Sequence, residues 1–372
     1  MPTSHTKRAF IVLAVLLGIA AVGAGFYLHR LNRSIPAAGA GPAHNLSSEQ
    51  PSGIGQTPSL PYDILSGLPA NAPAIAYVDV AALRKLQGSP LSAVLGLTNG
   101  DPQGDNDYRE FVRNTGFDYT RDLDRLAIAF WPTNLGGTAP GDVPADQKVL
   151  AIADGRFDVP KIKAYALRTG KVMKSGREAL YEVPGNPPVS FEFLSSGRIA
   201  IASGKNAKDL LTMPHSAALD PAVQADIARI GGAPIFGVAR IDRLPGSFYA
   251  SFKNSPQLER LVRSVQDLTL SGQPRGDILN ITLGGQTNSV KNAIEIATLL
   301  EISRMGASMA LIDPKANRQM TKAQAAFLDA LVKQVKISRQ ERLVRLSLDI
   351  TPEMLASEST SSAGASQSGT TR

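Results

Sequence analysis

A stretch of twenty residues without a charged side chain, Ala9–Leu28 (AFIVLAVLLGIAAVGAGFYL), constrains this chain more than any other feature. As a helix rising about 1.5 Å per residue, it would be roughly 30 Å long, which matches the hydrocarbon core of a bilayer. Two basic residues precede the stretch and two follow it closely, so flanking charge hardly decides its orientation. We expect a single-pass signal-anchor with a cytoplasmic tail, residues 1–8, because large domains translocate largely regardless of charge.

A cleavable signal peptide is the competing interpretation of the same stretch. The apolar region of a signal peptide is usually about 7–15 residues long and ends in small residues. Val22-Gly23-Ala24 and Ala38-Gly39-Ala40 would suit such a cleavage site. Cleavage there would produce a secreted protein instead of an anchored one.

The remainder of the chain divides by composition. Residues 29–61 are rich in Pro, Gly, Ser and Ala, which is typical of a flexible linker. Residues 357–372 contain almost no large apolar side chain and are predicted to be a disordered tail. Between them we expect a first α+β half over 62–232 and a second over 233–356.

Short apolar or alternating runs separated by turn residues predict strands in both halves. In Val189–Leu194, apolar residues alternate with Ser190 and Glu192, which indicates a strand with one buried face. The fold class predicted is α+β, with mostly antiparallel sheets and packed helices. The strands expected are Ala74–Val80, Arg125–Trp131, Val149–Ala153, Leu180–Val183, Val189–Leu194, Ile199–Ala202, Ile235–Ile241, Leu268–Leu270, Leu279–Leu283, Val335–Ser338 and Val344–Ile350.

Capping signals mark the helices between these strands. Asp158-Val159-Pro160 combines an N-cap aspartate with a proline in the first turn. A long helix is expected to begin near Asn288 and to carry Val290, Ile294 and Ala297. Thr321 and Gln324 form a T-x-x-Q capping box ahead of another helix.

The two halves share a weak repeat. Ala72-Pro73 and Ala233-Pro234 each open a strand, and Gly155-x-x-Asp158-x-x-Lys161 matches Gly285-x-x-Asn288-x-x-Lys291. A duplication would explain these matches, and so would independent use of the same turn and cap residues.

Composition excludes several classes of protein. The absence of cysteine rules out disulfides, thiolate metal sites and cysteine nucleophiles. Of the net charge of +7, the ends of the chain contribute +3, from five basic and two acidic residues that lie before residue 60 or after residue 355. The charges of the folded part nearly balance, so we do not expect a nucleic-acid partner.

Catalytic, cofactor-binding and metal-binding motifs are also missing. There is no G-x-x-x-x-G-K-[ST], G-x-G-x-x-G or G-x-S-x-G motif. His215 is the one histidine of the predicted folded part, and a lone loop histidine is usually solvated. The acidic loop near Asp105 lacks the glycine of a calcium loop, and we expect both it and the acidic loop near Asp122 to be solvated. We therefore predict no catalytic residue, cofactor or metal.

One stretch, from Arg156 to Arg177, is markedly basic. It could meet anionic lipid head groups or an acidic envelope polymer, and the alternative is the solvated face of a surface helix and its following loop. Its basic residues are Arg156, Lys161, Lys163, Arg168, Lys171, Lys174 and Arg177.

The opening of the folded part, Leu68-Pro69-Ala70-Asn71-Ala72-Pro73 running into Ala76–Val80, resembles uncharacterised bacterial membrane-anchored envelope proteins with an LPA-x-x-P opening motif. Gly116–Tyr119 followed by Arg121–Asp124 is similar to them too. The resemblance covers about a third of the chain. Those proteins carry domains of unknown function, so the resemblance implies export and an α+β repeat architecture but no activity.

The sequence thus favours a non-catalytic protein of the bacterial inner (cytoplasmic) membrane, with its folded domain outside the cytoplasm. It would work by binding, with an envelope protein or an anionic polymer as partner. Two alternatives stay open: an envelope hydrolase that uses paired carboxylates or a Ser-Lys pair, and a module that binds anionic lipid or polymer through the basic stretch.

Overall fold

A computed structural model describes most of the chain after the predicted linker. The described residues are 61–85, 106–131, 148–175, 178–183, 188–204, 208–212, 219–230, 232–244, 246–250, 256–312, 329–352 and 354. The predicted anchor and the predicted tail lie outside them, as does the start of the helix expected after Thr321, whose described residues 329–334 are helical.

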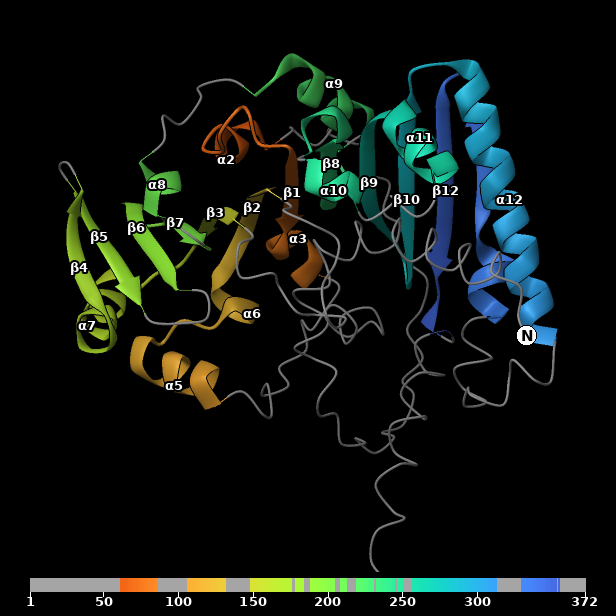
Figure 1. The fold of residues 1–372 in the computed structure, drawn as a ribbon. Helices are drawn as coiled ribbons and strands as arrows, with labels where there is room; N and C mark the ends of the chain where they lie inside the picture. Colours follow the sequence, from red (N-terminus) through yellow and green to blue (C-terminus); the bar gives the residue numbers. More distant parts are fainter. Residues whose placement is uncertain are drawn as a thin grey trace, which may run out of the picture.

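The described strands form one twelve-stranded sheet in which every neighbouring pair is antiparallel (Figure 1). This confirms the α+β class with an antiparallel sheet. Strands from both sides of the predicted boundary at residue 233 share that sheet. They are β1 (Ala74–Asp79), β2 (Leu123–Trp131), β3 (Lys148–Gly155), β4 (Lys171–Ser175), β5 (Glu178–Val183), β6 (Val189–Ser195), β7 (Arg198–Ser203), β8 (Ile235–Arg240), β9 (Val265–Arg275), β10 (Ile278–Thr287), β11 (Lys336–Gln340) and β12 (Leu343–Ile350), in the spatial order β11-β12-β10-β9-β8-β1-β2-β3-β7-β6-β5-β4.

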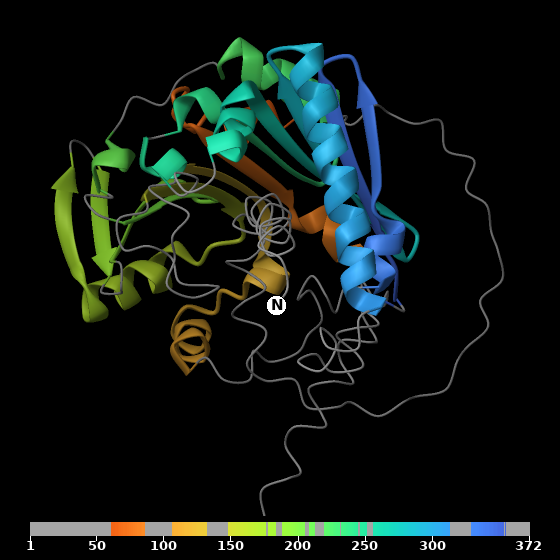
Figure 2. The same cartoon turned by 45° about the vertical axis from the view of Figure 1, so that its right-hand side comes forward.

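Helices pack on both faces of the curved sheet (Figure 2). They are α2 (Tyr62–Leu65), α3 (Val80–Arg84), α5 (Asn106–Thr115), α6 (Tyr119–Asp122), α7 (Val159–Thr169), α8 (Lys208–Leu211), α9 (Pro221–Ile230), the 3-10 helix η1 (Ile241–Arg243), α10 (Gly246–Ala250), α11 (Pro256–Ser264) and α12 (Val290–Ile312).

Side-chain caps start several of these helices. The carboxylate of Asp158 accepts a hydrogen bond from the backbone N–H of Lys161 over 3.2 Å, so the predicted cap of α7 is confirmed. Asp79 caps α3 in the same way, and the hydroxyl of Ser289 accepts from the N–H of Asn292 at the start of α12. Each cap satisfies a backbone donor that the first turn of a helix leaves free.

The core has two layers because alternate residues of each strand point to opposite faces. On one face, Ile75 and Tyr77 of β1 pack in a cluster with side chains of α2, α8 and α9. On the other face, Ala74 packs with Phe248 and Tyr249 of α10, while α7 covers Tyr181 and Phe191. The central strands are therefore buried on both sides.

The centre of the sheet is the antiparallel pair of β1 and β8, with Ala74 opposite Ala239 and Val78 opposite Ile235. Outward from this pair, the chain runs β1-β2-β3 on one side and β8-β9-β10 on the other. The third strand of each series is followed in sequence by a helix, α7 or α12. Each series is then extended by a later strand, β7 or β12.

In the described part of the chain, the two edges of the sheet are β4 and β11. β4 was not expected from the sequence, because its residues Lys171–Ser175 contain two lysines and no run of apolar side chains. It is held by pairing with β5. The predicted basic stretch therefore spans a helix and an edge strand.

Candidate functional site

The long helix α12 exposes a line of large apolar side chains. We call this line the α12 stripe. Its members lie three, four or eight positions apart, spacings that keep them on one side of a helix, and each is between 46% and 67% exposed. They are Val290, Ile294, Ile302, Met305 and Met309.

The opposite side of α12 is buried against the sheet. Ala293 and Leu300 pack with Val344 of β12, and Ser303 and Ala307 are also buried. Packing on the sheet accounts for this inner side.

The outer side carries Lys291, Thr298 and the 42% exposed Glu301 among the residues of the stripe. A surface helix normally keeps large apolar residues off its outer side, so five of them on one helix suggest a partner for this surface of the described domain.

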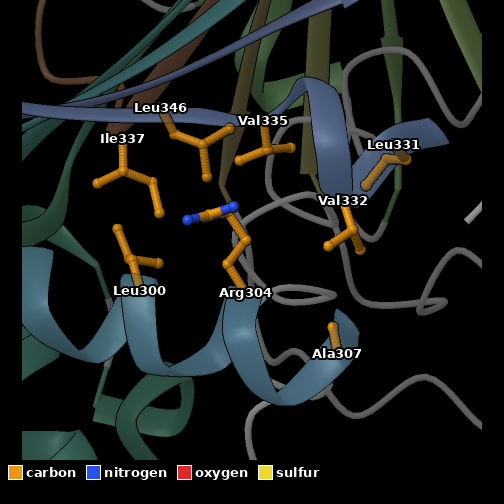
Figure 3. Close-up of a pocket in the computed structure, with 8 residues that line it drawn as sticks. All are labelled: Leu300, Arg304, Ala307, Leu331, Val332, Val335, Ile337 and Leu346. Carbon is orange, nitrogen blue, oxygen red and sulfur yellow. The ribbon is translucent and has the colours of Figure 1, made fainter. Parts of the chain in front are cut away.

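A small cavity lies under α12, between it and the chain segment that leads into β11 (Figure 3). It encloses about 10 Å³, room for about one water molecule. The guanidinium group of Arg304 lies among its apolar side chains and donates from Nε to Glu301 over 2.9 Å. The cavity is lined by Leu300, Arg304, Ala307, Leu331, Val332, Val335, Ile337 and Leu346, and it is too small for a substrate.

A second feature is a pair of buried aspartates between α9 and the sheet. Asp226 of α9 is 2% exposed and Asp267 of β9 is 9% exposed. Arg229 donates to Oδ1 of Asp226 over 2.5 Å, and its Nη1 lies 3.8 Å from Oδ1 of Asp267. Oδ2 of Asp226 and Oδ1 of Asp267 accept no hydrogen bond from the described residues.

Burial raises the pKa of both carboxyl groups of this aspartate pair, because the charged form loses its hydration. The pKa of Asp267 rises to about 6, helped by the negative charge of Asp226 and opposed by Arg229 and Arg240. A proton taken up by Asp267 below about pH 6 would relieve the repulsion. The pair could act as an acid or base only if α9 moved away, since the helix covers it.

An ion-pair network on the same face of the sheet joins α2 to three strands. Arg125 of β2 donates to both oxygens of Asp63, over 3.0 and 2.7 Å, and to Asp154 of β3 over 2.6 Å. Arg198 of β7 donates to the same two carboxylates. Every charge in this network has an opposite neighbour, so it fastens α2 to the sheet and leaves no group free for chemistry.

The basic stretch is spread over the end of β3, α7 and β4. Three of its side chains are in ion pairs: Arg156 lies 3.5 Å from Asp122, Lys161 lies 2.8 Å from Asp158, and Lys171 lies 2.8 Å from Glu182.

Of the remaining side chains of the stretch, Lys163 lies over the ring of Phe193 and Arg168 donates to Asn114. The side chain of Lys174 and all of Arg177 lie outside what the structure describes. The structure therefore does not gather these residues into one open cluster, and anionic binding there stays a prediction.

Other residues considered from the sequence have structural roles or fall outside the described ranges. Asp122 accepts from Arg121 and from the N–H of Asp118, which lowers its pKa. His215 and Asp105 are not in the described residues. Within those residues, no three His, Cys, Asp or Glu side chains are placed to hold a metal ion, and no helix has the length and apolar character needed to cross a bilayer.

Sequence reasoning found the start of α12 but missed the α12 stripe, because the sequence does not show which apolar side faces the sheet. Val290 and Ile294, expected on this helix, are both 46% exposed. The aspartate pair left no signal, since Asp226 and Asp267 are far apart in the chain and belong to no motif.

Comparison with known proteins identifies no family for this chain. No protein-family model and no curated protein matches the chain. Among solved structures, three crystal forms of TP0453 are similar, at 15%, 15% and 14% identity with TM-scores of 0.44, 0.41 and 0.42. The matches cover 80%, 82% and 80% of this chain and 98%, 99% and 96% of those chains.

Proposed function

We propose that the chain is a non-catalytic, membrane-anchored protein of the bacterial envelope that works by binding through the α12 stripe. The observation that carries this proposal is the stripe itself: five large apolar side chains on the outer side of a helix whose inner side already packs on the sheet. Exposed apolar residues gathered in one place mark interaction sites on folded proteins.

The uncharged stretch Ala9–Leu28 supports the location. In this proposal it crosses the inner membrane once and holds the folded domain outside the cytoplasm. Alkaline carbonate extraction of membranes, with N-terminal sequencing of the mature protein, tests this part. An anchored protein stays in the pellet with its N-terminus intact, whereas a mature sequence that begins after Ala24 or Ala40 would mean secretion.

Binding through α12 is tested by photo-crosslinking in intact cells. A photoreactive amino acid replaces Ile302 in one variant and Ser338, which is exposed on β11, in the control. The proposal expects an adduct, with lipid or with protein, from position 302 and none from position 338. Equal adducts at both positions, or none at either, would contradict it.

A second candidate function is hydrolysis of envelope material by the aspartate pair. The raised pKa of Asp267, about 6, favours it, because a carboxyl group that titrates near neutral pH can act as an acid or a base. The test is turnover of cell-wall material by the full chain and by Asp267→Asn. Turnover that Asp267→Asn abolishes would replace binding with catalysis as the function.

We also propose that the two halves of the sheet arose by duplication. The matching order of strands outward from β1 and β8, with a helix after the third strand of each series, supports it. So do the Ala-Pro dipeptides that precede both central strands.

A further inference from the structure

We infer that the α12 stripe lies on the surface of the bilayer that anchors the chain, with its apolar side chains at the boundary between head groups and acyl chains. This inference rests on the proposed function, because it names the partner of the same surface. It assigns the folded domain an orientation as well as a location: α12 faces the membrane and is parallel to it.

The shape of the stripe suits a planar apolar partner. Val290 and Met309 are nineteen positions apart, so the stripe is about 28 Å long on a straight helix. Helices that lie in the plane of a membrane insert one apolar side by about 5–10 Å, and their other side stays out of the bilayer. In α12 that other side is held by β10, β11 and β12.

A second copy of the chain fits the stripe less well. Stable protein–protein interfaces usually engage about 20–30 residues on each partner. The α12 stripe offers five apolar side chains in a single line. A bilayer needs no matching surface, and each apolar side chain gains from insertion on its own.

The predicted linker brings this surface to the membrane. Residues 29–61 have the composition of a flexible chain, for which a root-mean-square end-to-end distance of about 30 Å is expected. The folded domain is then confined within a few nanometres of the bilayer. Tethering raises the effective concentration of lipid at the stripe. The stripe would therefore be inserted in most molecules even if its affinity for the bilayer were weak.

The absence of cysteine allows a direct test on the full chain reconstituted in phosphatidylcholine–phosphatidylglycerol vesicles. Single cysteines replace Ile302 and Met309 on the stripe, Ser338 on the far face of β11, and Leu17 within the predicted anchor. Each is labelled with an environment-sensitive fluorophore, and the vesicles carry lipids with a nitroxide quencher at shallow or deep positions.

The expected result is loss of fluorescence at positions 302 and 309 with the shallow quencher, loss at position 17 with the deep one, and no loss at position 338. Quenching at 17 without quenching at 302 and 309 would overturn this inference and leave the anchor standing. No quenching at 17 would overturn the proposed location and the inference with it. A blue shift at 302 that depends on protein density and resists the lipid quenchers would identify a second copy, and would also overturn it.

Discussion

The backbone N–H of Asp79 donates to the carbonyl oxygen of Pro234 over 2.7 Å, and this bond has a counterpart in which the N–H of Arg240 donates to Pro73 over the same distance. The two bonds close the two ends of the β1–β8 pair. Each links the last residue of one central strand to the proline that precedes the other. The junction between the two series of strands is therefore as fully bonded as the strand pairs within each series.

Replacing Phe236 tests how much this junction stabilises the fold. Phe236 is 1% exposed, and its ring stacks on Tyr77 across β8 and β1 with ring centres 5.0 Å apart. Phe236→Ala should lower the free energy of unfolding by about 3–5 kcal/mol, the usual cost of emptying a core site of this size. Ile278→Ala, at a partly exposed position, is the control. Equal, small effects in denaturant titrations would contradict the assignment of β1–β8 as the core.

Asp267→Asn should change how stability depends on pH. A carboxyl group with a raised pKa is bound to a proton more tightly in the folded state than in the unfolded one. The wild-type protein should therefore gain stability as the pH falls from about 6 towards 4. At pH 7 the variant should be more stable by up to about 3 kcal/mol, since it carries no buried charge.

The measurement for Asp267→Asn is the free energy of unfolding in denaturant between pH 4 and pH 8. Asp209→Asn, at an exposed position on α8, is the control and should follow the wild-type curve. Parallel curves for wild type and Asp267→Asn would show that the buried carboxyl does not titrate in this range.

Arg198→Gln should destabilise the domain by about 1–3 kcal/mol. Asp154 is only 13% exposed and would keep a single cationic partner, Arg125, for a carboxylate that now has two. Thermal unfolding by circular dichroism measures the effect. Arg275→Gln at the tip of the β9–β10 hairpin is exposed and should be neutral, so a similar loss in both variants would refute a specific role for the network.

Gly155→Ala should also be destabilising, for a purely steric reason. A Cβ atom at position 155 would lie 2.3 Å from the carbonyl oxygen of Asp122, at the point where β3 passes the start of β2. Overpacking of this kind typically costs about 1–3 kcal/mol. Gly246→Ala on α10 meets no atom within 4 Å and should be neutral or slightly stabilising. Equal melting temperatures for the two variants would argue against the close approach at Gly155.

The strands that the sequence predicted well are those with a local pattern. Val189–Leu194 alternates and forms β6, and its apolar residues Phe191 and Phe193 belong to the core cluster under α7. The expected solvated face was wrong at Ser190, which is 3% exposed because helices pack on both faces of the sheet. By contrast, β4 has no such pattern and exists because β5 pairs with it. Its strand conformation depends on pairing with β5, and a local sequence pattern cannot show such pairing.

The α12 stripe and the aspartate pair were harder to predict than the fold, because each depends on which helix covers which strand. The sequence does not show which apolar residues of α12 face the sheet until β12 is placed against Leu300 and Ala293. Asp226 and Asp267 become a pair only when α9 lies over β9. The basic stretch was visible in the sequence, yet the carboxylates that partner Arg156 and Lys171 come from other elements.

The two edge strands have a consequence for a chain held in a membrane as proposed. An edge strand presents a row of unpaired amide and carbonyl groups, to which an edge of another molecule can add. Here β4 carries Lys171 and Lys174, and β11 carries Lys336 and Arg339, while Glu182 and Asp349 partly offset the charges of Lys171 and Lys336. Molecules confined to one membrane meet often, with their sheet edges at similar distances from the bilayer. Positive charges on both edges would then keep neighbouring molecules from joining into a continuous sheet.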